Sequence, residues 1–393
     1  MPTRTADVVV VGAGIMGASI AFQLASRSDC RVVVLDERPP VGGISGRTFG
    51  QIRQHYSNQL LVEMAIRGFD VIQNWDTEVG VGDPGYVRLG YLLLVVEDQL
   101  GPLRRNIELG QSCGVDTKFV AGGDIAAIEP SLTTDDLAGG AYEPNGGYID
   151  VTKMVLSWLS AAQVRGAELS SGVRVQRLLT DGDRVVGVST DAGDISAPTV
   201  VVATGAWGRE LLDPVGVSVP LEKRRLDMSV LQLEPGRPQM HSCITDGNSN
   251  VVLRPDMGRR FLAVAYPDDM PLVDDPLAPA AAGDYVRHLE RLDAAFMARM
   301  PALRGASLVS HISGAYDVTP DYHPVLGPVD GVDGLVVAVG FSGHGLKLSP
   351  AIGEVVASIA LGEEPGFEVD PLRLSRFVDG EPMFCAYGPG ARA

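Results

Sequence analysis

Two glycine-rich stretches of the chain have the residue types and spacing to bind an anion or an electron-rich ring. Residues 12–17 read GAGIMG, and residues 340–350 read GFSGHGLKLSP. Glycine has no Cβ, so such stretches let backbone N–H groups come within hydrogen-bond distance of a ligand. The second stretch also holds His344 and Lys347, and lysine is scarce in this chain, where the others are Lys118, Lys153 and Lys223. We therefore expect both stretches to contribute to a ligand site.

The first stretch lies between elements that together form a dinucleotide-binding fingerprint. Residues 7–11 form an apolar, mostly β-branched run typical of a buried parallel strand, and residues 18–26 have the character of a helix. A second strand, residues 31–35, is followed by Asp36, which stands 24 residues after Gly12. An ordinary βαβ turn would not need three glycines at this spacing, so the pattern predicts dinucleotide binding.

Each residue of this fingerprint has a physical role. Gly12 makes the tight turn, Gly14 lets the backbone approach the pyrophosphate, and Gly17 lets the helix pack closely on the strand. The N-terminus of the helix offers free N–H groups and a partial positive charge to the phosphates. Asp36 is expected to accept hydrogen bonds from the ribose hydroxyl groups and to repel a 2′-phosphate.

The composition argues against several classes of protein. A chain of 393 residues predicts two or three domains, and its net charge of −17 argues against nucleic-acid binding, which needs a basic face. The four cysteines are scattered without metal-ligand spacing, and we expect no metal site. The apolar run from Val8 to Ala25 lacks both a cleavage motif and the length of a membrane span. We predict a cytoplasmic protein that is not bound to a membrane.

The segments after Asp36 favour FAD over NAD as the dinucleotide. A nicotinamide enzyme would continue with further βα units, whereas residues 41–56 form a Gly/Ser-rich loop with two arginines. An amphipathic helix is predicted over residues 58–79. Residues 173–195 read as an alternating hairpin, and residues 199–207 as a buried strand closed by a Thr-Gly turn.

Four of these segments resemble a known family in the same order over nearly the whole chain. They are the GxGxxG motif with its acid, the Ser-Gly-Arg loop, the strand VVVATGAW and the block GFSGHGLKLSP. The sequence is similar to the FAD-dependent amine oxidoreductases of the D-amino acid oxidase superfamily, in the branch of sarcosine oxidase, dimethylglycine oxidase and glycine oxidase. This resemblance implies an α/β fold with a discontinuous Rossmann-like FAD-binding domain, residues 1–88, 149–215 and 310–393. It also implies a mainly antiparallel α+β substrate domain, residues 89–148 and 216–309.

The resemblance also assigns contacts to FAD residue by residue. The cofactor is expected to be non-covalent, because Gly314 stands where monomeric sarcosine oxidase has its flavin-linking cysteine. In addition, no histidine occurs in the loop after Asp36, where the dimethylglycine branch links its flavin. The residues assigned to the cofactor before the second glycine-rich stretch are Gly12, Gly14, Ile15, Met16, Gly17, Asp36, Ser45, Gly46, Arg47, Thr48, Val175, Thr204, Gly205 and Trp207.

The second glycine-rich stretch is predicted to lie between a buried strand, residues 335–339, and a helix, residues 350–361. Ser349 is expected at the N-cap of this helix and Pro350 in its first turn. Backbone N–H groups and the positive end of a helix would favour the reduced flavin. His344 is either a packed, hydrogen-bonded loop residue or a neighbour of the flavin that adjusts its potential. The residues of the turn assigned to the cofactor are Gly343, His344, Gly345, Leu346 and Lys347.

The substrate contacts are implied by the same resemblance. Lys347 is similar to the carboxylate-binding lysine of the family, Arg53 aligns with its partner arginine, and Tyr316 aligns with a tyrosine that lines the substrate pocket. An arginine fork suits bidentate binding of a carboxylate, and a lysine adds a compact charge. The alternatives are a phosphate contact or surface ion pair for Arg53, and a solvated surface position for Lys347.

The resemblance implies flavin-dependent oxidation of an amino acid, which we expect to be a secondary or N-methyl amine. Hydride transfer to flavin N5 would leave an imine, and oxygen or another acceptor would take the electrons. Residues 251–266 lack the lysine that monomeric sarcosine oxidase places near the flavin. Two alternatives remain. One is a 2-hydroxy-acid or glycerol-3-phosphate dehydrogenase with His55 or His344 as base. The other is an FAD-binding subunit of a larger hetero-oligomer. The acidic, Pro-rich segment 266–279 is either a mobile pocket loop or a surface connection, and we favour the surface connection.

Overall fold

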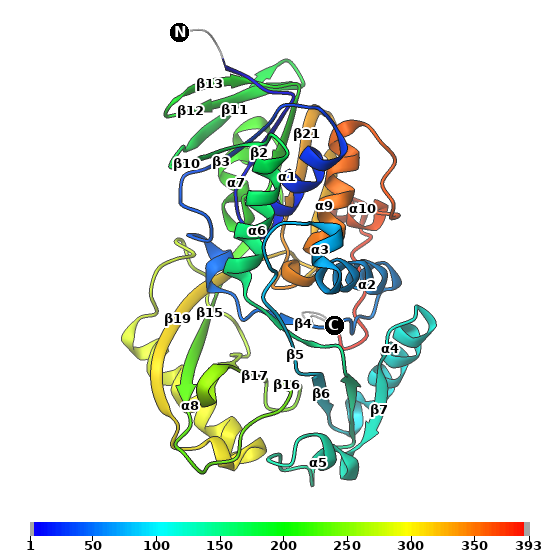
Figure 1. The fold of residues 1–393 in the computed structure, drawn as a ribbon, viewed down its shortest axis with the longest axis vertical. Helices are drawn as coiled ribbons and strands as arrows, with labels where there is room; N and C mark the ends of the chain where they lie inside the picture. Colours follow the sequence, from blue (N-terminus) through cyan, green and yellow to red (C-terminus); the bar gives the residue numbers. More distant parts are fainter. Residues whose placement is uncertain (1–3, 389–393) are drawn as a thin grey trace.

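Strands made mostly of valine form the centre of the upper half of the molecule (Figure 1). The structure, a computed structural model, describes residues 4–388, and within them ten strands form one sheet. Its central strands pair in parallel, as the buried β-branched runs predict. The hydrogen-bonded order is β1 (Arg4–Thr5), β13 (Gly193–Ser196), β12 (Arg184–Thr190), β21 (Val332–Val339), β14 (Thr199–Val202), β2 (Val8–Val11), β3 (Val32–Asp36) and β10 (Glu168–Ser171), with β11 (Val175–Asp181) beside β12 and β20 (Val325–Val329) beside β21.

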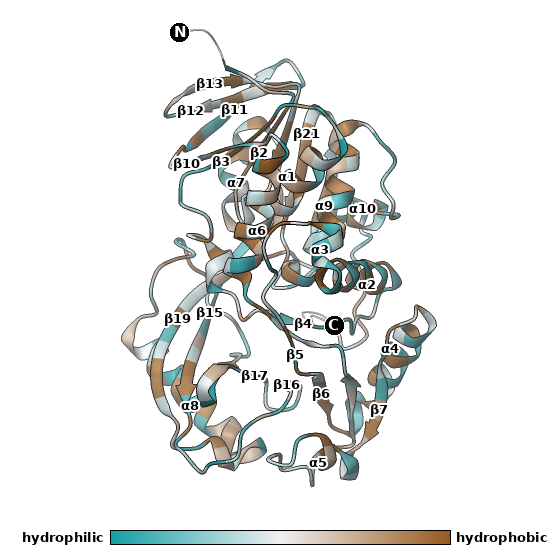
Figure 2. Ribbon diagram, in the orientation of Figure 1, coloured by the Kyte–Doolittle hydropathy of each residue, from teal (hydrophilic) through white to brown (hydrophobic). Residues whose placement is uncertain are grey.

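Three helices cover one face of this sheet. Helix α1 (Ile15–Arg27) packs against both α6 (Val151–Val164) and α9 (Gly345–Leu361). The N-termini of α1 and α9 follow the carboxyl ends of β2 and β21, the two parallel strands on either side of β14, so they lie at the same edge of the sheet. The strand–helix–strand fingerprint and the antiparallel hairpin β11–β12 are present as predicted. Figure 2 shows hydrophobic residues concentrated along these central strands, whereas α2 (Gln59–Gln73) turns hydrophilic residues outward.

A second sheet forms the lower half of the molecule. Within the described residues it has eight strands, antiparallel except where β16 pairs with β6. Helix α8 (Ala282–Arg299) packs on β18. Strand β19 crosses residue 310, where the predicted domain boundary lies, and that boundary stays a prediction. The strand order is β19 (Ser307–Val318), β15 (Glu222–Gln232), β18 (Arg260–Ala265), β17 (Val251–Pro255), β16 (Cys243–Asp246), β6 (Tyr91–Val95), β8 (Gly139–Glu143) and β7 (Lys118–Ala121).

Short elements connect the two halves. A three-stranded sheet, β4 (Gln51–Ile52), β9 (Gly147–Ile149) and β5 (Tyr86–Arg88), lies between them. The single helix predicted over residues 58–79 is wrong in one respect, because Asn74 leaves helical geometry and separates α2 from α3 (Trp75–Glu78). The remaining helices are α4 (Leu100–Ser112), α5 (Ile125–Ile128), α7 (Gly208–Leu212) and α10 (Arg376–Asp379).

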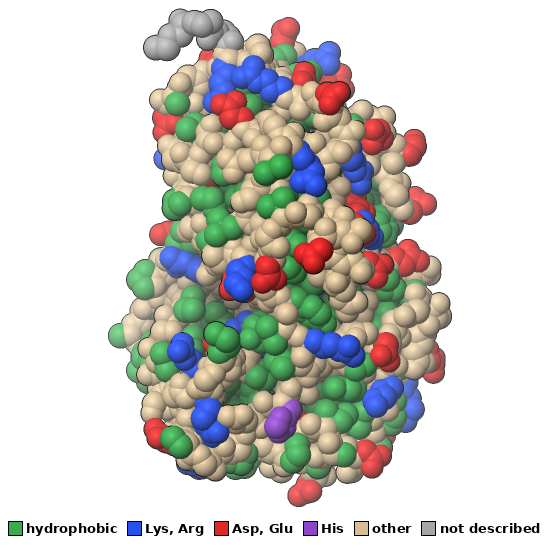
Figure 3. Space-filling view, in the orientation of Figure 1, with side chains coloured by type: hydrophobic (Ala, Val, Ile, Leu, Met, Phe, Trp, Pro, Cys, Tyr) green, Lys and Arg blue, Asp and Glu red, His purple; other side chains and the backbone are tan. Residues whose placement is uncertain are grey.

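The surface agrees with the charge of the sequence. On the face drawn in Figure 3, acidic and basic side chains are interspersed, and they do not form a continuous basic field. In the part of the chain that the structure describes, no helix is both long enough and apolar enough to span a bilayer.

Candidate active site

The first glycine-rich stretch forms a tight cradle between β2 and α1. Gly12 has a φ of +105°, and a Cβ there would lie 2.5 Å from the carbonyl oxygen of Ala203. A Cβ on Gly17 would lie 1.8 Å from the carbonyl oxygen of Gly12, so only glycine lets the helix approach the strand this closely. The N-cap residue of α1 is Gly14, which has no side chain to cap the helix. This geometry fits the predicted approach of a pyrophosphate to the helix N-terminus.

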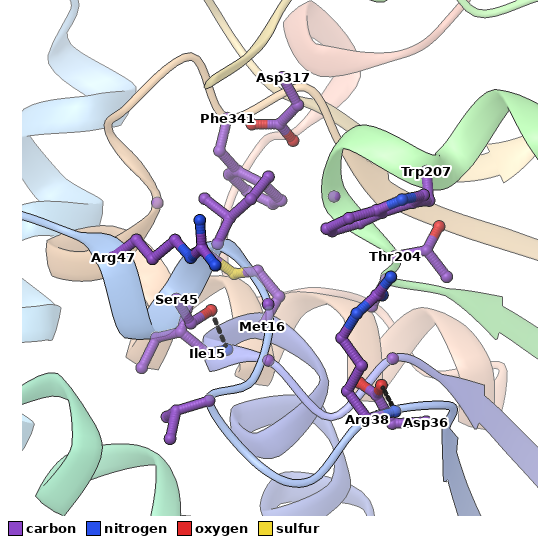
Figure 4. A pocket seen from close by; sticks show the side chains of 18 of the residues that line it. Ile15, Met16, Asp36, Arg38, Ser45, Arg47, Thr204, Trp207, Asp317 and Phe341 are labelled. Atoms are coloured by element: carbon purple, nitrogen blue, oxygen red, sulfur yellow. Dashed lines mark hydrogen bonds between the residues drawn. The ribbon is translucent and has the colours of Figure 1, made fainter. Parts of the chain in front are cut away.

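Two side chains from neighbouring segments fix this cradle. The carboxylate of Asp36, at the end of β3, accepts hydrogen bonds from the backbone N–H groups of Ala13 (2.7 Å) and Arg38 (2.8 Å). The hydroxyl of Ser45 accepts a hydrogen bond from the N–H of Ile15 at 3.0 Å, as Figure 4 shows. Carboxylate oxygens can accept more than one hydrogen bond each, so Asp36 also has capacity for ribose hydroxyl groups.

A large cavity runs along this cradle. At one end the guanidinium of Arg38 lies 4.6 Å from the ring centroid of Trp207, and both side chains are drawn in Figure 4. The Oγ1 of Thr204 also lines this cavity and is buried without a hydrogen-bond partner among the described residues. A buried hydroxyl without a partner is costly in a folded protein, so this end of the cavity suits a polar ligand. The sequence did not indicate Arg38.

The opposite end of the cavity is closed by the second glycine-rich stretch. Helix α9 starts at Gly345 with His344 as its N-cap residue, so the prediction that Ser349 caps the helix is wrong. Pro350 lies inside α9 and cannot donate to the carbonyl oxygen of Leu346, but the hydroxyl of Ser349 donates to that oxygen at 2.6 Å. The helix therefore begins earlier than predicted, at residue 345 and not at residue 350, and Lys347 lies in its first turn.

A buried carboxylate that the sequence analysis did not single out holds this turn. Asp317 Oδ2 accepts a hydrogen bond from the N–H of Gly340 at 2.8 Å, and the Asp317 carbonyl accepts one from the N–H of Ser342 at 3.1 Å. Burial raises the pKa of Asp317 to about 6, against the opposing effect of these backbone donors. Asp317 and Phe341 both line the cavity.

Most residues assigned to the cofactor line this cavity. Gly17 and Gly46 instead pack behind it, since a Cβ on Gly46 would lie 2.1 Å from the carbonyl oxygen of Val41. His344 and Lys347 line a second, adjoining cavity. The assigned residues in the wall of the first cavity are Gly12, Gly14, Ile15, Met16, Asp36, Ser45, Arg47, Thr48, Val175, Thr204, Gly205, Trp207, Gly343, Gly345 and Leu346.

The second cavity has a volume of about 610 Å³, and its wall contains the three residues predicted to contact the substrate, together with His344. It brings together Arg53, Tyr316, His344 and Lys347, which are far apart in the sequence. The two cavities share part of their walls, so a ligand in one can meet a ligand in the other. The shared residues are Thr48, Phe49, Tyr316, Gly343 and Leu346.

Arg53 lies in an aromatic and acidic environment. Its guanidinium carbon is 4.8 Å from the ring centroid of Tyr56 and 5.9 Å from that of Tyr91, and it donates a hydrogen bond to the carbonyl of His55. Burial alone would lower the pKa of Arg53, but the neighbouring tyrosines and Glu143 outweigh it and raise the pKa. Arg53 is therefore a permanent cation in the wall of this cavity.

Lys347 is also buried, with only 6% of its surface exposed. Its ammonium nitrogen lies 5.7 Å from the ring centroid of Tyr56, so Tyr56 lies close to both cations. Gly68 makes room for the backbone of α9 at this point, because a Cβ there would lie 2.1 Å from the carbonyl oxygen of Lys347. The alternative of a solvated surface lysine is wrong.

A buried glutamate beneath the two cations was missed by the sequence analysis. Glu143 is 1% exposed, and its Oε2 accepts a hydrogen bond from the backbone N–H of Gln54 at 2.7 Å. Burial raises the pKa of Glu143 to about 7, although the Gln54 N–H, Arg53 and Lys347 all favour the charged form. Without a bound anion, the group of Arg53, Lys347 and Glu143 carries a net positive charge, which suits a single carboxylate.

The interpretation of residues 266–279 as a mere surface connection is wrong for their first part. Residues 266–270 line the second cavity. The hydroxyl groups of Tyr266 and Tyr316 lie 3.2 Å apart across the cavity wall. No local pattern indicated this, because the segment is acidic and Pro-rich like many exposed loops.

Comparisons with known proteins agree with this architecture. The profile of the family described as FAD dependent oxidoreductase (DAO) matches residues 7–359, and the chain belongs to this family. The crystal structure of L-proline dehydrogenase from P. horikoshii matches with a TM-score of 0.88 and 25% identity, covering 98% of this chain and 100% of that one. The structure of glycine oxidase from Geobacillus kaustophilus matches with a TM-score of 0.82 and 26% identity, covering 95% and 99%. The predicted fold class and the family resemblance are confirmed.

A curated relative is longer than this chain. The 4-methylaminobutanoate oxidase (formaldehyde-forming) of Paenarthrobacter nicotinovorans is 25% identical over 382 residues, which cover 96% of this chain and 46% of that protein. The chain thus spans less than half the length of this relative. The family uses FAD, and the cradle, the hydroxyl of Thr204 and the turn before α9 fit this cofactor.

Proposed function

We propose that the protein oxidises an amino acid at the carbon next to its nitrogen, with a secondary or N-methyl amine as the preferred substrate. The observation that carries this proposal is a pair of cations, the half-buried Arg53 and the buried Lys347, in a cavity that shares a wall with the cofactor cavity. The relatives named above act on L-proline, glycine and 4-methylaminobutanoate according to their names, and each of these has an amine and a carboxylate.

The residues of the second cavity have separate tasks in this proposal. Arg53 and Lys347 bind the substrate carboxylate, and their charge lowers the pKa of the substrate nitrogen, which must lose its proton before oxidation. The hydroxyl of Tyr316, in the shared wall, orients the substrate toward the first cavity. His344 contributes to the same wall from the N-cap of α9. Bound FAD would supply the acceptor for a hydride equivalent from the substrate carbon, and water would hydrolyse the resulting imine.

The first cavity supports non-covalent attachment of FAD. Its described lining contains neither cysteine nor histidine, the residues on which flavin is attached in the related enzymes. Gly314 occupies the position of the linking cysteine. A Cβ placed on Gly314 would lie 3.3 Å from the Cβ of Arg47. We further propose that the FAD-binding and substrate-binding domains have the boundaries expected from the sequence.

The low pKa of His55 disfavours this residue, one of the two histidines considered, as the base of a 2-hydroxy-acid dehydrogenase. Burial, and then the charge of Arg53, lower the pKa of His55 to about 3. A histidine with so low a pKa is a weak base for removing the proton of an alcohol. The amine reaction needs no such base once the substrate nitrogen is neutral.

The electron acceptor is open to direct test. Among the described residues that line the two cavities, Lys347 is the only lysine, and this proposal assigns it to the carboxylate. We therefore propose a dehydrogenase that passes its electrons to a partner and reacts slowly with oxygen.

Anaerobic reduction by a panel of sarcosine, L-proline, glycine and 4-methylaminobutanoate tests the substrate class. Reoxidation of the reduced protein in air, followed by stopped flow, tests the acceptor.

A further inference from the structure

A segment far from the sequence motifs contributes to the second cavity. After α10 the chain runs back to the level of β4, where Figure 1 draws it in red. The backbone N–H of Met383 donates to the carboxylate of Asp321 at 3.0 Å, and the carbonyl of Phe384 accepts from the side chain of Asn58 at 2.7 Å. The N–H of Ala386 donates to the hydroxyl of Ser57 at 3.0 Å. Two of these three hydrogen bonds, those of Ser57 and Asn58, hold the segment beside the loop that carries Arg53.

The segment places one side chain in the cavity wall. Tyr387 lines the second cavity, and its ring packs against a buried cluster that includes Tyr91. Its hydroxyl lies 2.8 Å from Nε2 of His55, the residue whose carbonyl accepts a hydrogen bond from Arg53. The side chain of Asn106 hydrogen-bonds to the same hydroxyl. Its amide nitrogen also donates to Ser57 at 3.0 Å and lies 3.4 Å from Nε2 of His55.

These neighbours orient the proton of the Tyr387 hydroxyl. An amide nitrogen can only donate, so the Asn106 amide leaves the phenolic oxygen as acceptor. The imidazole of His55 is neutral, because its pKa is lowered to about 3 by burial and by Arg53. Nε2 of His55 lies 2.8 Å from the phenolic oxygen and 3.4 Å from the amide nitrogen of Asn106, so it donates to the phenolic oxygen only in the tautomer that carries its proton on Nε2. In that tautomer two donors converge on the oxygen, and the phenolic proton is available to a ligand in the cavity.

The hydroxyl remains protonated under ordinary conditions. Burial raises the pKa of Tyr387 well above its ordinary value, with a further contribution from Tyr91 and an opposing one from Arg53. A neutral phenol next to a guanidinium is a suitable third donor for a carboxylate that the guanidinium already binds.

We propose that Tyr387 is a substrate-binding residue, which donates its hydroxyl to the substrate carboxylate beside Arg53 and is delivered to the site by residues 381–388. This inference rests on the proposed function, because it places the carboxylate of an amino acid at Arg53 and Lys347. It also explains why the polar contacts of the segment converge on residues 55–58, the part of the chain next to Arg53.

The test compares the FAD-loaded wild type with three variants of the full chain. Tyr387→Phe removes only the hydroxyl, and Ser57→Ala leaves Tyr387 intact but removes the acceptor for the Ala386 N–H. Phe384→Ala is the matched control, since Phe384 lies in the same segment with 68% of its surface exposed. Anaerobic reduction by the best substrate of the panel separates the apparent Kd from the limiting rate. Titration of the oxidised protein with acetate, followed by flavin absorbance, gives the Kd of a carboxylate that cannot be oxidised.

We expect Tyr387→Phe to raise both Kd values roughly tenfold, as the loss of a hydrogen bond to a charged group implies, with the limiting rate changed less than about threefold. Ser57→Ala should raise them by a smaller factor, and Phe384→Ala should leave them unchanged. Equal Kd values for the wild type and Tyr387→Phe, with flavin reduction intact, would overturn this inference alone. Failure of every amine to reduce the wild type would overturn the proposed function, and the inference with it.

Discussion

Replacement of Arg53 by lysine tests the carboxylate site with the smallest change in charge. Arg53 lies beside the rings of Tyr56 and Tyr91 and in the field of Glu143, so a lysine keeps the cation but loses the planar fork. A unit charge about 4 Å from a carboxylate contributes about 4 kcal/mol at an effective dielectric constant of about 20, and this part is largely retained. The loss is one charge-assisted hydrogen bond, about 1.5–3 kcal/mol, or a roughly 10–150-fold rise in Kd.

Arg53→Gln removes the charge as well. Truncating one partner of a buried charge pair costs about 2–5 kcal/mol, so we expect a roughly 30-fold to several-thousand-fold rise in Kd. The assay is anaerobic stopped-flow reduction of the FAD-loaded protein over a range of substrate concentrations. Arg105→Lys, at an exposed position of α4, serves as the control and should behave like the wild type. The carboxylate site is refuted if Arg53→Lys binds FAD and its apparent substrate Kd stays within twofold of the wild-type value.

Three other parts of the structure lead to further predictions. Gly17→Ala should lose FAD on purification, because the new Cβ would overlap the carbonyl oxygen of Gly12. Gly123→Ala is the control and should keep FAD, because no atom lies within 4 Å of its new Cβ. Equal FAD content in the two variants would contradict this prediction. Burial raises the pKa of Glu143 to about 7 from 4.5, so the folded protein binds this proton more tightly than the unfolded chain, and this stabilising effect is lost as pH rises from 4.5 through 7. The unfolding temperature of Glu143→Gln minus that of the wild type should therefore increase as the pH rises from 5 to 8. A difference that stays constant over this range would be evidence against the prediction. Arg376→Met should lower the unfolding free energy by about 3–5 kcal/mol in urea titrations, because it leaves the buried carboxylate of Asp321 without its ion pair; a loss below about 1 kcal/mol would not fit.

The sequence was sufficient where the information is local. The cradle of residues 12–17 depends on atoms within one strand, one turn and one helix, so the spacing of its glycines is enough to assign their roles. The start of α9 was misplaced for a local reason too. Ser-Pro is a common signal for a helix start, but here Ser349 compensates inside the helix for the hydrogen bond that Pro350 cannot make.

The substrate cavity was predictable only in part. Arg53 and Lys347 were found through the family resemblance, since 294 positions separate them and no spacing rule connects them. Glu143 and Tyr387 carry no motif. The pairing of β8 brings Glu143 close to the two cations, and hydrogen bonds of the segment after α10 bring Tyr387 to the cavity wall. Contacts between such distant segments depend on the whole fold, so sequence patterns of a few residues could not indicate them.

The measurement that tests the central claim most directly is an absorbance spectrum of the purified protein before and after anaerobic addition of a secondary amino acid. We expect a yellow protein whose flavin is released by denaturation and whose flavin absorbance is bleached by sarcosine or L-proline. A colourless protein that takes up no FAD would contradict the claim. So would a flavin that stays oxidised with every amine but is reduced by a 2-hydroxy acid.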